Sequence, residues 1–230
     1  MNKSFTQASK QEIAAIILAG GTARRLADKR PPGGKAECII DGQSLLSLVS
    51  GALGPVTRLI LVVGGELPKV SSQELVSICH IPDRQPGSGP LAAVRDGLRW
   101  IWHEHSKSLP QFVILSACDL PSIKPSLVAE MVDRFPQDGL STRWVIPEVG
   151  KRLQYLFSVC RPTILQPLDS FFAAGGRDFR SFVQYLQEHE STSIHVISDA
   201  IWRTIDPNGH AGSDIDTPAD LALYSSDASH

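Results

Sequence analysis

An apolar segment that runs directly into two adjacent glycines constrains this chain more than any other part of its sequence. Residues 13–18 (IAAIIL) are apolar and rich in β-branched side chains, which is typical of a strand buried on both faces of a parallel sheet. Gly20 and Gly21 then let the backbone turn sharply and come close to a ligand. Arg24 and Arg25 add fixed positive charge beside a loop whose N–H groups attract anions. The segment therefore predicts a loop that holds nucleotide phosphates.

Two familiar phosphate-binding loops do not match this segment. A Walker A loop needs a lysine followed by serine or threonine, whereas Lys35 is followed by Ala36. A dinucleotide-binding fingerprint needs three spaced glycines that open a helix, and no third glycine follows Gly20 and Gly21 at that spacing. A tight turn without a ligand is the alternative that these residues alone leave open.

Composition narrows the class of protein further. With 230 residues, 42% of them hydrophobic, the chain can bury one sizeable core, so we expect a single domain over residues 12–225 between a disordered lead-in (1–11) and a short tail (226–230). The net charge of −2 gives no basic field for nucleic-acid binding. The sequence contains neither a signal peptide nor the roughly 20 consecutive apolar residues of a membrane span. We therefore expect a cytoplasmic protein, with its four scattered cysteines reduced and bound to no zinc.

Strands alternate with helices through most of the sequence. The predicted strands are 13–18, 59–63, 76–81, 112–115, 144–146, 153–160 and 194–197, and the predicted helices are 44–53, one that begins at Pro90, 125–135, 162–172, 178–188 and one that begins at Pro218. The strands at 144–146 and 153–160 have no full crossover between them, so one of them is expected to run antiparallel. The pattern predicts a Rossmann-like α/β sandwich of three layers with a mostly parallel sheet.

Polar residues follow the carboxyl ends of three predicted strands. Ligands bind beyond these ends in open α/β sheets. The glycine loop follows the first strand, Asp83 the third and Asp119 the fourth. Asp119 is a candidate Mg²⁺ ligand, because magnesium prefers one or two carboxylates together with phosphate oxygens, and its alternative role is to cap the next turn. Asp83 is either an acceptor for the base or ribose of a nucleoside or part of a helix start.

Two further groups are candidates for the same site. Asp214 and Asp216 are spaced i, i+2, so their side chains point the same way in an extended segment. The alternative role of Asp216 is to begin a helix, and Asp220, in the first turn, is interpreted as a surface charge that complements the helix dipole. Lys35 is either a phosphate clamp or a solvated lysine.

Six motifs occur in an order that resembles one family. They are Leu18-Ala19-Gly20-Gly21-x-x-x-Arg25, Lys35 seven residues before Gly42, Pro82-Asp83 with Gly89-Pro90-Leu91, Cys118-Asp119-Leu120-Pro121, Gln154-x-Leu156-Phe157, and Asp214-Ile215-Asp216-Thr217-Pro218-x-Asp220-Leu221. Over residues 13–224 the set resembles the MobA-like nucleotidyltransferases, and among them the molybdenum cofactor guanylyltransferases. The resemblance implies a fold of the nucleotide-diphospho-sugar transferase type.

The resemblance also implies roles for individual residues. The triphosphate of GTP would lie against the backbone of Leu18, Ala19, Gly20 and Gly21 and against Arg25, with Lys35 neutralising phosphate charge. Asp83 and Gly89 would lie in the guanosine site, and Asp119 and Asp216 would hold Mg²⁺, with Asp214 near the metal and the transferred nucleotide. The segment 151–154 resembles the side that receives the phosphate of the pterin acceptor.

In the reaction that the resemblance implies, the terminal phosphate of molybdopterin attacks the α-phosphorus of GTP and pyrophosphate leaves. Arg25, Lys35 and Asp119 would act by positioning and charge neutralisation, so no protein nucleophile is needed. The expected partners are GTP, molybdopterin and, transiently, cofactor-biosynthesis proteins or acceptor molybdoenzymes, without nucleic acid or membrane. The alternatives are transfer from CTP, transfer to another phosphorylated acceptor, or a nucleotide-binding regulator without turnover.

The sequence departs from the family pattern after its glycine loop. Ala23 stands where the family has serine, and Leu26-Ala27 replaces its methionine and glycine. The insertion 28–34 creates a second lysine, Lys29, which follows an aspartate as the family's lysine does. The spacing to Gly42 favours Lys35 as the phosphate clamp, although Gly34 then occupies the position of that aspartate.

Overall fold

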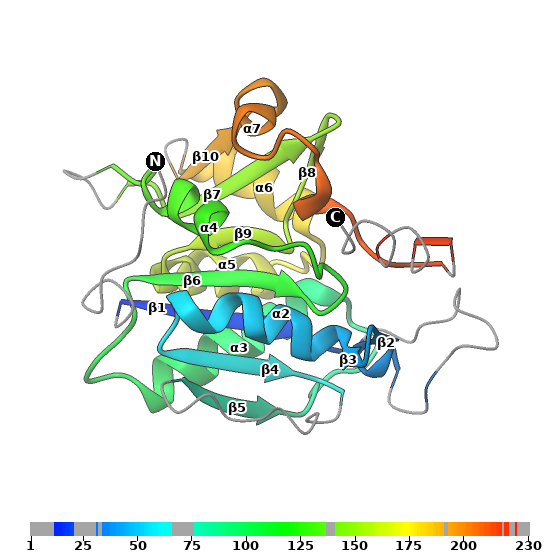
Figure 1. The fold of residues 1–230 in the computed structure, drawn as a ribbon. Helices are drawn as coiled ribbons and strands as arrows, with labels where there is room; N and C mark the ends of the chain where they lie inside the picture. The colour runs from blue at the N-terminus through cyan, green and yellow to red at the C-terminus, as the bar shows by residue number, and fades with distance from the viewer. Residues whose placement is uncertain are drawn as a thin grey trace.

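The fold is built on one twisted sheet (Figure 1). The computed structural model describes residues 12–20, 31, 34–65, 76–136, 141–190, 193–217, 219–220 and 224. The strands of the sheet lie in the order β10-β7-β9-β6-β1-β4-β5, and β8 pairs with β7. Their bounds are β1 Ile13–Leu18, β4 Leu59–Val63, β5 Ser77–Ile81, β6 Phe112–Ala117, β7 Trp144–Val149, β8 Arg152–Leu153, β9 Phe157–Cys160 and β10 Ile194–Ile197.

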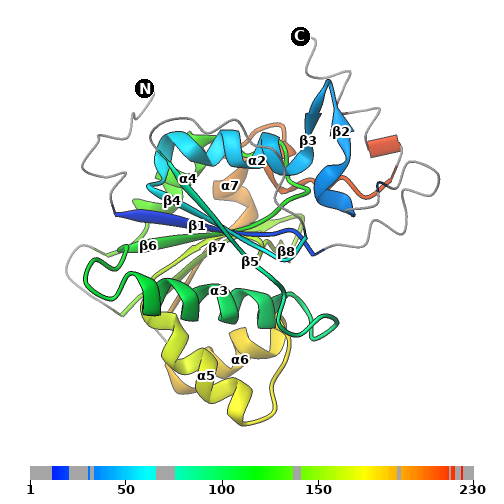
Figure 2. The ribbon, with the colours of Figure 1, turned by 90° about the horizontal axis from the view of Figure 1, so that it is seen from below.

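Helices cover both faces of this sheet and give the three layers (Figure 2). Helices α2 (Leu45–Leu53), α4 (Pro125–Val132) and α7 (Asp199–Ile205) pack on one face, and α3 (Pro90–Glu104), α5 (Leu165–Ala173) and α6 (Phe179–His189) pack on the other. Side chains of β1 alternate between the two resulting cores, because successive residues of a strand point to opposite faces. Both faces of β1 are therefore buried, which confirms the interpretation of its apolar sequence.

Four strands of the sheet have their carboxyl ends at the same edge: β1, β4, β5 and β6. β1 runs parallel to β4 and β6, and β4 runs parallel to β5; Leu18, the last residue of β1, is level with Val63 of β4 and Ala117 of β6. β9 lies antiparallel between β6 and β7. The prediction of a mostly parallel sheet that contains an antiparallel strand is confirmed.

Two predicted helices begin where the sequence indicates, after the cap residue Ser44 and at Pro90. The Ser44 side chain accepts a hydrogen bond from the Ser47 N–H at 3.1 Å and caps α2. Pro90 is the first residue of α3, where its missing N–H costs nothing, and Gly89 before it has a φ of 87°, which favours glycine. The predicted apolar stripe of α3 is buried: Leu91, Val94, Leu98 and Ile101.

The prediction of one continuous strand over residues 153–160 is wrong. It consists of two short strands, β8 on β7 and β9 between β6 and β7, separated by a turn in which the Phe157 N–H donates to the Gln154 carbonyl at 3.2 Å. An apolar run does not say which strand each of its residues pairs with, so the change of partner was invisible in the sequence.

Several elements were not predicted. They are α7, a 3₁₀ helix at Lys35–Glu37, and a small hairpin of β2 (Ile39–Ile40) and β3 (Gln43–Ser44). The hairpin turn is made by Asp41 and Gly42, both with positive φ, and Asp-Gly is a sequence signal for such two-residue turns. The predicted helix 125–135 ends at Val132.

Some predictions concern residues outside the described part of the chain. These are the lead-in 1–11, the tail 226–230 and most of the helix expected from Pro218. All four cysteines are free thiols, as predicted, with Cys38, Cys118 and Cys160 buried. Among the described helices, each is too short or too polar to cross a membrane.

Two helical glycines provide a test of the packing between α3 and β1. A Cβ at Gly97 of α3 would lie 3.0–3.3 Å from three side-chain atoms of Ile16, which is buried in β1, whereas a Cβ at Gly51 of α2 would meet nothing within 4 Å. We expect Gly97→Ala to lower the free energy of unfolding by about 1 kcal/mol because it overpacks this contact. Gly51→Ala should raise it by about 0.5 kcal/mol through helix propensity. Urea unfolding measures both, and equal stabilisation by the two variants would contradict the tight α3–β1 contact.

Candidate functional site

A cavity of about 350 Å³ lies at the carboxyl ends of the parallel strands. Its walls are largely apolar, and its polar groups come from a lysine and two aspartates. The lining residues are Leu18, Gly20, Lys35, Val63, Asp83, Gly87, Gly89, Pro90, Ala93, Ala117, Cys118, Asp119 and Leu156. The cavity therefore has the position and composition of a small-molecule site in an open α/β sheet.

The segments that leave these strands stay hydrogen-bonded to one another. The Ala19 N–H donates to the Val63 carbonyl at 2.9 Å, and the Cys118 N–H donates to the Leu18 carbonyl at 3.1 Å. Gly64, which follows β4, has a φ of 74°, and a Cβ there would lie 3.2 Å from the Gly20 Cα. A side chain at this position would therefore be strained and would push against the glycine loop.

Asp83 lies just beyond the carboxyl end of β5, as the sequence predicts. Its Oδ1 accepts a hydrogen bond from the Gln85 N–H at 2.9 Å, which closes a local turn before Gly89 and α3. Asp83 also lines the cavity together with Gly89 and Pro90. The same carboxylate thus shapes the loop and faces the cavity.

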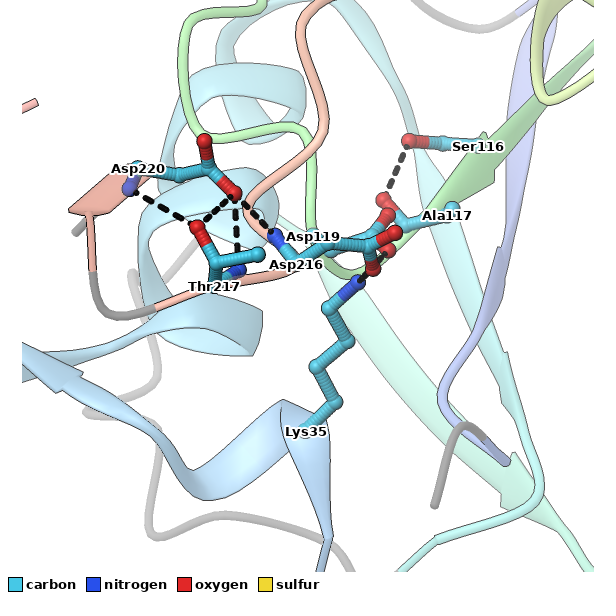
Figure 3. A network of polar contacts seen from close by, with 7 residues as sticks. All are labelled: Lys35, Ser116, Ala117, Asp119, Asp216, Thr217 and Asp220. Atoms are coloured by element: carbon cyan, nitrogen blue, oxygen red, sulfur yellow. Dashed lines mark hydrogen bonds and ion pairs between the residues drawn. The ribbon is translucent and has the colours of Figure 1, made fainter. Parts of the chain in front are cut away.

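Three carboxylates and one lysine meet beside the cavity. Figure 3 shows the lysine, Lys35, with two of the carboxylates, Asp119 and Asp216. Oxygen atoms of Asp119, Asp214 and Asp216 lie within 4.8 Å of one another. Lys35, only 7% exposed, places its Nζ 2.5 Å from Asp119 Oδ2 and also donates to Asp216 Oδ1. The lysine thereby connects the end of β6 with the segment around Asp216, which comes after the last strand, β10, in the sequence.

This arrangement fixes the charges of the cluster. Burial by itself would lower the pKa of Lys35, but the carboxylates of Asp119 and Asp216 raise it above its ordinary value. Lys35 therefore stays protonated at neutral pH. Loss of hydration and the neighbouring charges of Asp216 and Asp119 raise the pKa of the Asp214 carboxyl. Three acidic groups share one ammonium, so the cluster attracts a further cation.

A small core holds the segments of the cluster in place. Ile215 packs with Cys38, Ile40 and Leu45, and its N–H donates to the Asp119 carbonyl at 3.0 Å. Lys35 stands three residues before Cys38, in the 3₁₀ helix that leads to the β2–β3 hairpin. This small core therefore links the segment that follows Lys35 to the segment that carries Asp214 and Asp216.

The Cys118 thiol has no role as a nucleophile in this site. Burial raises its pKa to about 12, with the Asp119 charge adding to the effect, so it is neutral at physiological pH. Cys118 serves as a wall of the cavity next to Asp119.

The structure brings most of the predicted site residues together. Leu18, Gly20, Lys35, Asp83, Gly89 and Asp119 line the cavity, and Asp214 and Asp216 join Asp119 in the carboxylate cluster. Ala19 is buried rather than part of the lining. Gly21, Arg25 and Lys29 lie outside the described residues. Residues 151–154 belong to the β7–β8 hairpin and do not line the cavity.

Asp220 differs from its interpretation as a surface charge. Its Oδ2 accepts hydrogen bonds from the Asp216 N–H at 3.0 Å, the Thr217 N–H at 2.7 Å and the Thr217 hydroxyl at 2.8 Å. The threonine followed three residues later by an acidic residue is close to the capping-box pattern, and that spacing was the available signal.

The fold defines a class of structure, the nucleotide-diphospho-sugar transferase fold. The structure of molybdopterin-guanine dinucleotide biosynthesis protein A from Archaeoglobus fulgidus matches 94% of this chain and 98% of its own, with a TM-score of 0.68 and 19% identity. That of 4-diphosphocytidyl-2C-methyl-D-erythritol synthase from Anaerococcus prevotii matches 98% and 100%, with a TM-score of 0.67 and 11% identity. At these identities the two structures establish the fold.

The sequence comparisons establish the family. The model of the MobA-like NTP transferase domain matches residues 15–192. A probable molybdenum cofactor guanylyltransferase from Chloroflexus aggregans is 31% identical over 92% of both chains, and one from Trichormus variabilis is 27% identical over 92% of this chain and 89% of its own. The chain belongs to the MobA-like NTP transferase family.

The contacts of Lys35 predict a stability effect that needs no substrate. Lys35→Met leaves Asp119, Asp214 and Asp216 without their ammonium, so we expect the free energy of unfolding to fall by about 2 kcal/mol at neutral pH, discounted for the partial exposure of the aspartates. The loss should shrink near pH 4, because the Asp214 carboxyl, whose pKa is raised by loss of hydration and by the charges of Asp216 and Asp119, takes up a proton and no longer repels them. Urea unfolding at both pH values measures it. Lys124→Met, at an exposed lysine before α4, is the control, and equal losses would contradict the role of the cluster.

Proposed function

We propose that this protein transfers GMP from GTP to the terminal phosphate of molybdopterin and releases pyrophosphate. The observation that carries the proposal is the contact of Lys35 with Asp119 and Asp216 beside a cavity at the strand ends. It places a cation and two carboxylates where a nucleotide triphosphate would lie in this fold. The relatives named molybdenum cofactor guanylyltransferases support the choice of GTP and molybdopterin.

The nucleotide occupies the cavity in this proposal. The backbone of Leu18, Ala19 and Gly20, continued by Gly21 and Arg25, holds the triphosphate, because N–H groups and an arginine favour phosphate oxygens. Asp83 and Gly89 lie on the nucleoside side, where the Asp83 carboxylate accepts hydrogen bonds from a base or ribose. Apolar wall residues such as Val63 and Leu156 exclude water from the same space.

Asp119 and Asp216 are the proposed ligands of Mg²⁺, with Asp214 beside them. The donor set fits the ion, since these carboxylate oxygens lie within 4.8 Å of one another and Mg²⁺ prefers carboxylates together with phosphate oxygens and water. When bound, Mg²⁺ would supply charge neutralisation at the phosphates of the nucleotide. Lys35, which contacts both carboxylates, belongs to the same site.

The chemistry proceeds without a protein nucleophile. An oxygen of the acceptor's terminal phosphate attacks the α-phosphorus, and the bond from that phosphorus to the bridging oxygen of the β-phosphate breaks. Pyrophosphate leaves with the electron pair. Lys35 and Arg25 neutralise the charge that gathers on the phosphate oxygens, and the strand ends hold both reactants in line. The neutral thiol of Cys118 takes no part.

The proposed acceptor side is the β7–β8 hairpin. Lys151 and Arg152 are exposed on the β7–β8 hairpin and are proposed to receive the acceptor's phosphate or pterin. A cytoplasmic location and transient contacts with cofactor-biosynthesis proteins or acceptor molybdoenzymes also stay predictions.

Pyrophosphate release tests the proposal directly. The purified protein is supplied with Mg²⁺, molybdopterin and one of GTP, CTP or ATP. We expect release with GTP to exceed release with CTP by about tenfold or more, because contacts made to one base edge are left unpaired by another. Faster release with CTP would overturn the guanylyl assignment. Nucleotide binding without release from any triphosphate would overturn transfer itself and favour a regulator. Release that requires a different phosphorylated acceptor would overturn molybdopterin as the substrate.

The metal-ligand variant Asp119→Asn is the matched negative control for that assay. It retains the size of the side chain but loses the charge, so we expect turnover to fall by about 100-fold or more. Asp133→Asn changes an exposed aspartate at the end of α4 in the same way and should retain turnover. Full turnover in Asp119→Asn would remove the proposed metal role.

A comparison of two lysines tests the proposed phosphate clamp. We expect Lys35→Ala to reduce kcat/KM for GTP by about 100-fold, because Lys35 is the lysine that contacts Asp119 and Asp216. Lys29→Ala, in the insertion after the glycine loop, should have a much smaller effect. Steady-state kinetics of both variants decide the question, and a larger loss at Lys29 would overturn the assignment of Lys35.

A further inference from the structure

Asp220 makes a contact that a helix cap does not require (Figure 3). In a capping box, a threonine at the helix start and an acidic residue three positions later bond to each other's N–H groups. Thr217 and Asp220 do so: the Thr217 N–H donates to Asp220 Oδ2 at 2.7 Å, and the Asp220 N–H donates to the Thr217 hydroxyl at 3.3 Å. The same Oδ2 also accepts the N–H of Asp216 at 3.0 Å. This additional bond reaches outside the cap, to the residue proposed to hold the metal.

Asp216 depends on its backbone for its placement. Its side chain is 32% exposed, so packing alone does not fix the direction of its carboxylate. Immediately before it in the chain, Ile215 anchors the segment through its buried side chain and its hydrogen bond to the Asp119 carbonyl. Asp220 accepts the N–H of Asp216 and the N–H of Thr217, which belong to the peptide planes on the two sides of Asp216. Both peptide planes of Asp216 are therefore held by Asp220, next to the anchor at Ile215.

We infer that Asp220 is a positioning residue of this site. By accepting the Asp216 N–H, it directs the Asp216 carboxylate toward Asp119 and so sets how tightly the pair binds a divalent cation. The inference rests on the proposed function for the identity of the metal ligands. Hydrogen bonds to a charged carboxylate are stronger than those between neutral groups, so three donors on one oxygen hold the segment firmly.

Binding of Mn²⁺ alone, followed by electron paramagnetic resonance of the free ion, is the primary measurement. We expect Asp220→Ala to weaken Mn²⁺ binding by about tenfold, the lower end of the range known for groups that orient metal ligands. The Mg²⁺ concentration needed for half-maximal pyrophosphate release should rise by a similar factor. Asp220→Asn keeps an oxygen that can accept the Asp216 N–H and should retain most of the binding.

Two variants separate positioning from capping. Thr217→Val removes the hydroxyl bonds of the cap but leaves the Asp216 N–H bonded to Asp220, so it should lose stability while keeping Mn²⁺ affinity. Asp178→Ala removes a comparable cap at α6, where Asp178 accepts the Ser181 N–H at 2.9 Å and its hydroxyl at 2.8 Å. It should likewise leave Mn²⁺ binding unchanged. If Asp220→Ala does not fold, Asp220→Ser, whose polar side chain is one bond too short to keep the hydrogen bond from the Asp216 N–H, takes its place and should show the same weakening.

The outcomes are distinct from those of the proposed reaction. Parent-like Mn²⁺ binding in Asp220→Ala, or equal weakening in Asp178→Ala or Thr217→Val, would overturn the positioning role. Weakening in Asp220→Asn as large as in Asp220→Ala would show that charge rather than the hydrogen bond matters, and would also overturn it, as would a parent protein that binds no Mn²⁺. Failure of the proposed function would instead appear as an absence of pyrophosphate release in a parent protein that still binds the ion.

Discussion

The contact of the Lys35 ammonium with the carboxylates of Asp119 and Asp216 joins three parts of the chain that are far apart in sequence. Asp119 stands at the end of a central strand, Lys35 after the insertion that follows the glycine loop, and Asp216 in a segment beyond the last strand. Lys35, the most buried of the three, needs the opposite charges of the other two, because an ion loses much hydration free energy on burial. The position of each therefore depends on the other two, and the geometry of the site depends on all three.

The parts of the fold and the site that sequence could predict are those with a local cause. The strands at 13–18 and 59–63 follow from runs of apolar residues, the start of α2 from Ser44, and the shared edge from the rule that ligands bind at carboxyl ends of parallel strands. The break between β8 and β9 was invisible because it depends on partner strands. The hydrogen bond from the Asp216 N–H to the Asp220 carboxylate could not be predicted for a different reason. A sequence does not show which N–H groups a carboxylate contacts.

The insertion before Lys35 is accommodated without removing the lysine from the site. Gly34, which stands where the resemblance places an aspartate, has a φ of 83°, a conformation that an aspartate adopts only with strain. The 3₁₀ helix that follows then turns Lys35 toward Asp119. The backbone conformation at this position therefore favours glycine. As a result, this chain has no carboxylate at the position where the family pattern has an aspartate. Asp214 and Asp216 supply acidic groups to the cluster from elsewhere.

The small core of Cys38, Ile40, Leu45 and Ile215 has a consequence for how the site comes into existence. It lies apart from the two large cores of the sheet, and among the described residues Ile215 is its buried member from the end of the chain, with Tyr224 packed against it. The two large cores do not contain Ile215, whereas the acidic cluster is complete only when Ile215 is docked against Cys38, Ile40 and Leu45. The fold and the acidic cluster therefore depend on different contacts. A chain with intact main cores but an undocked Ile215 would retain the cavity at the strand ends and lack the complete cluster of carboxylates.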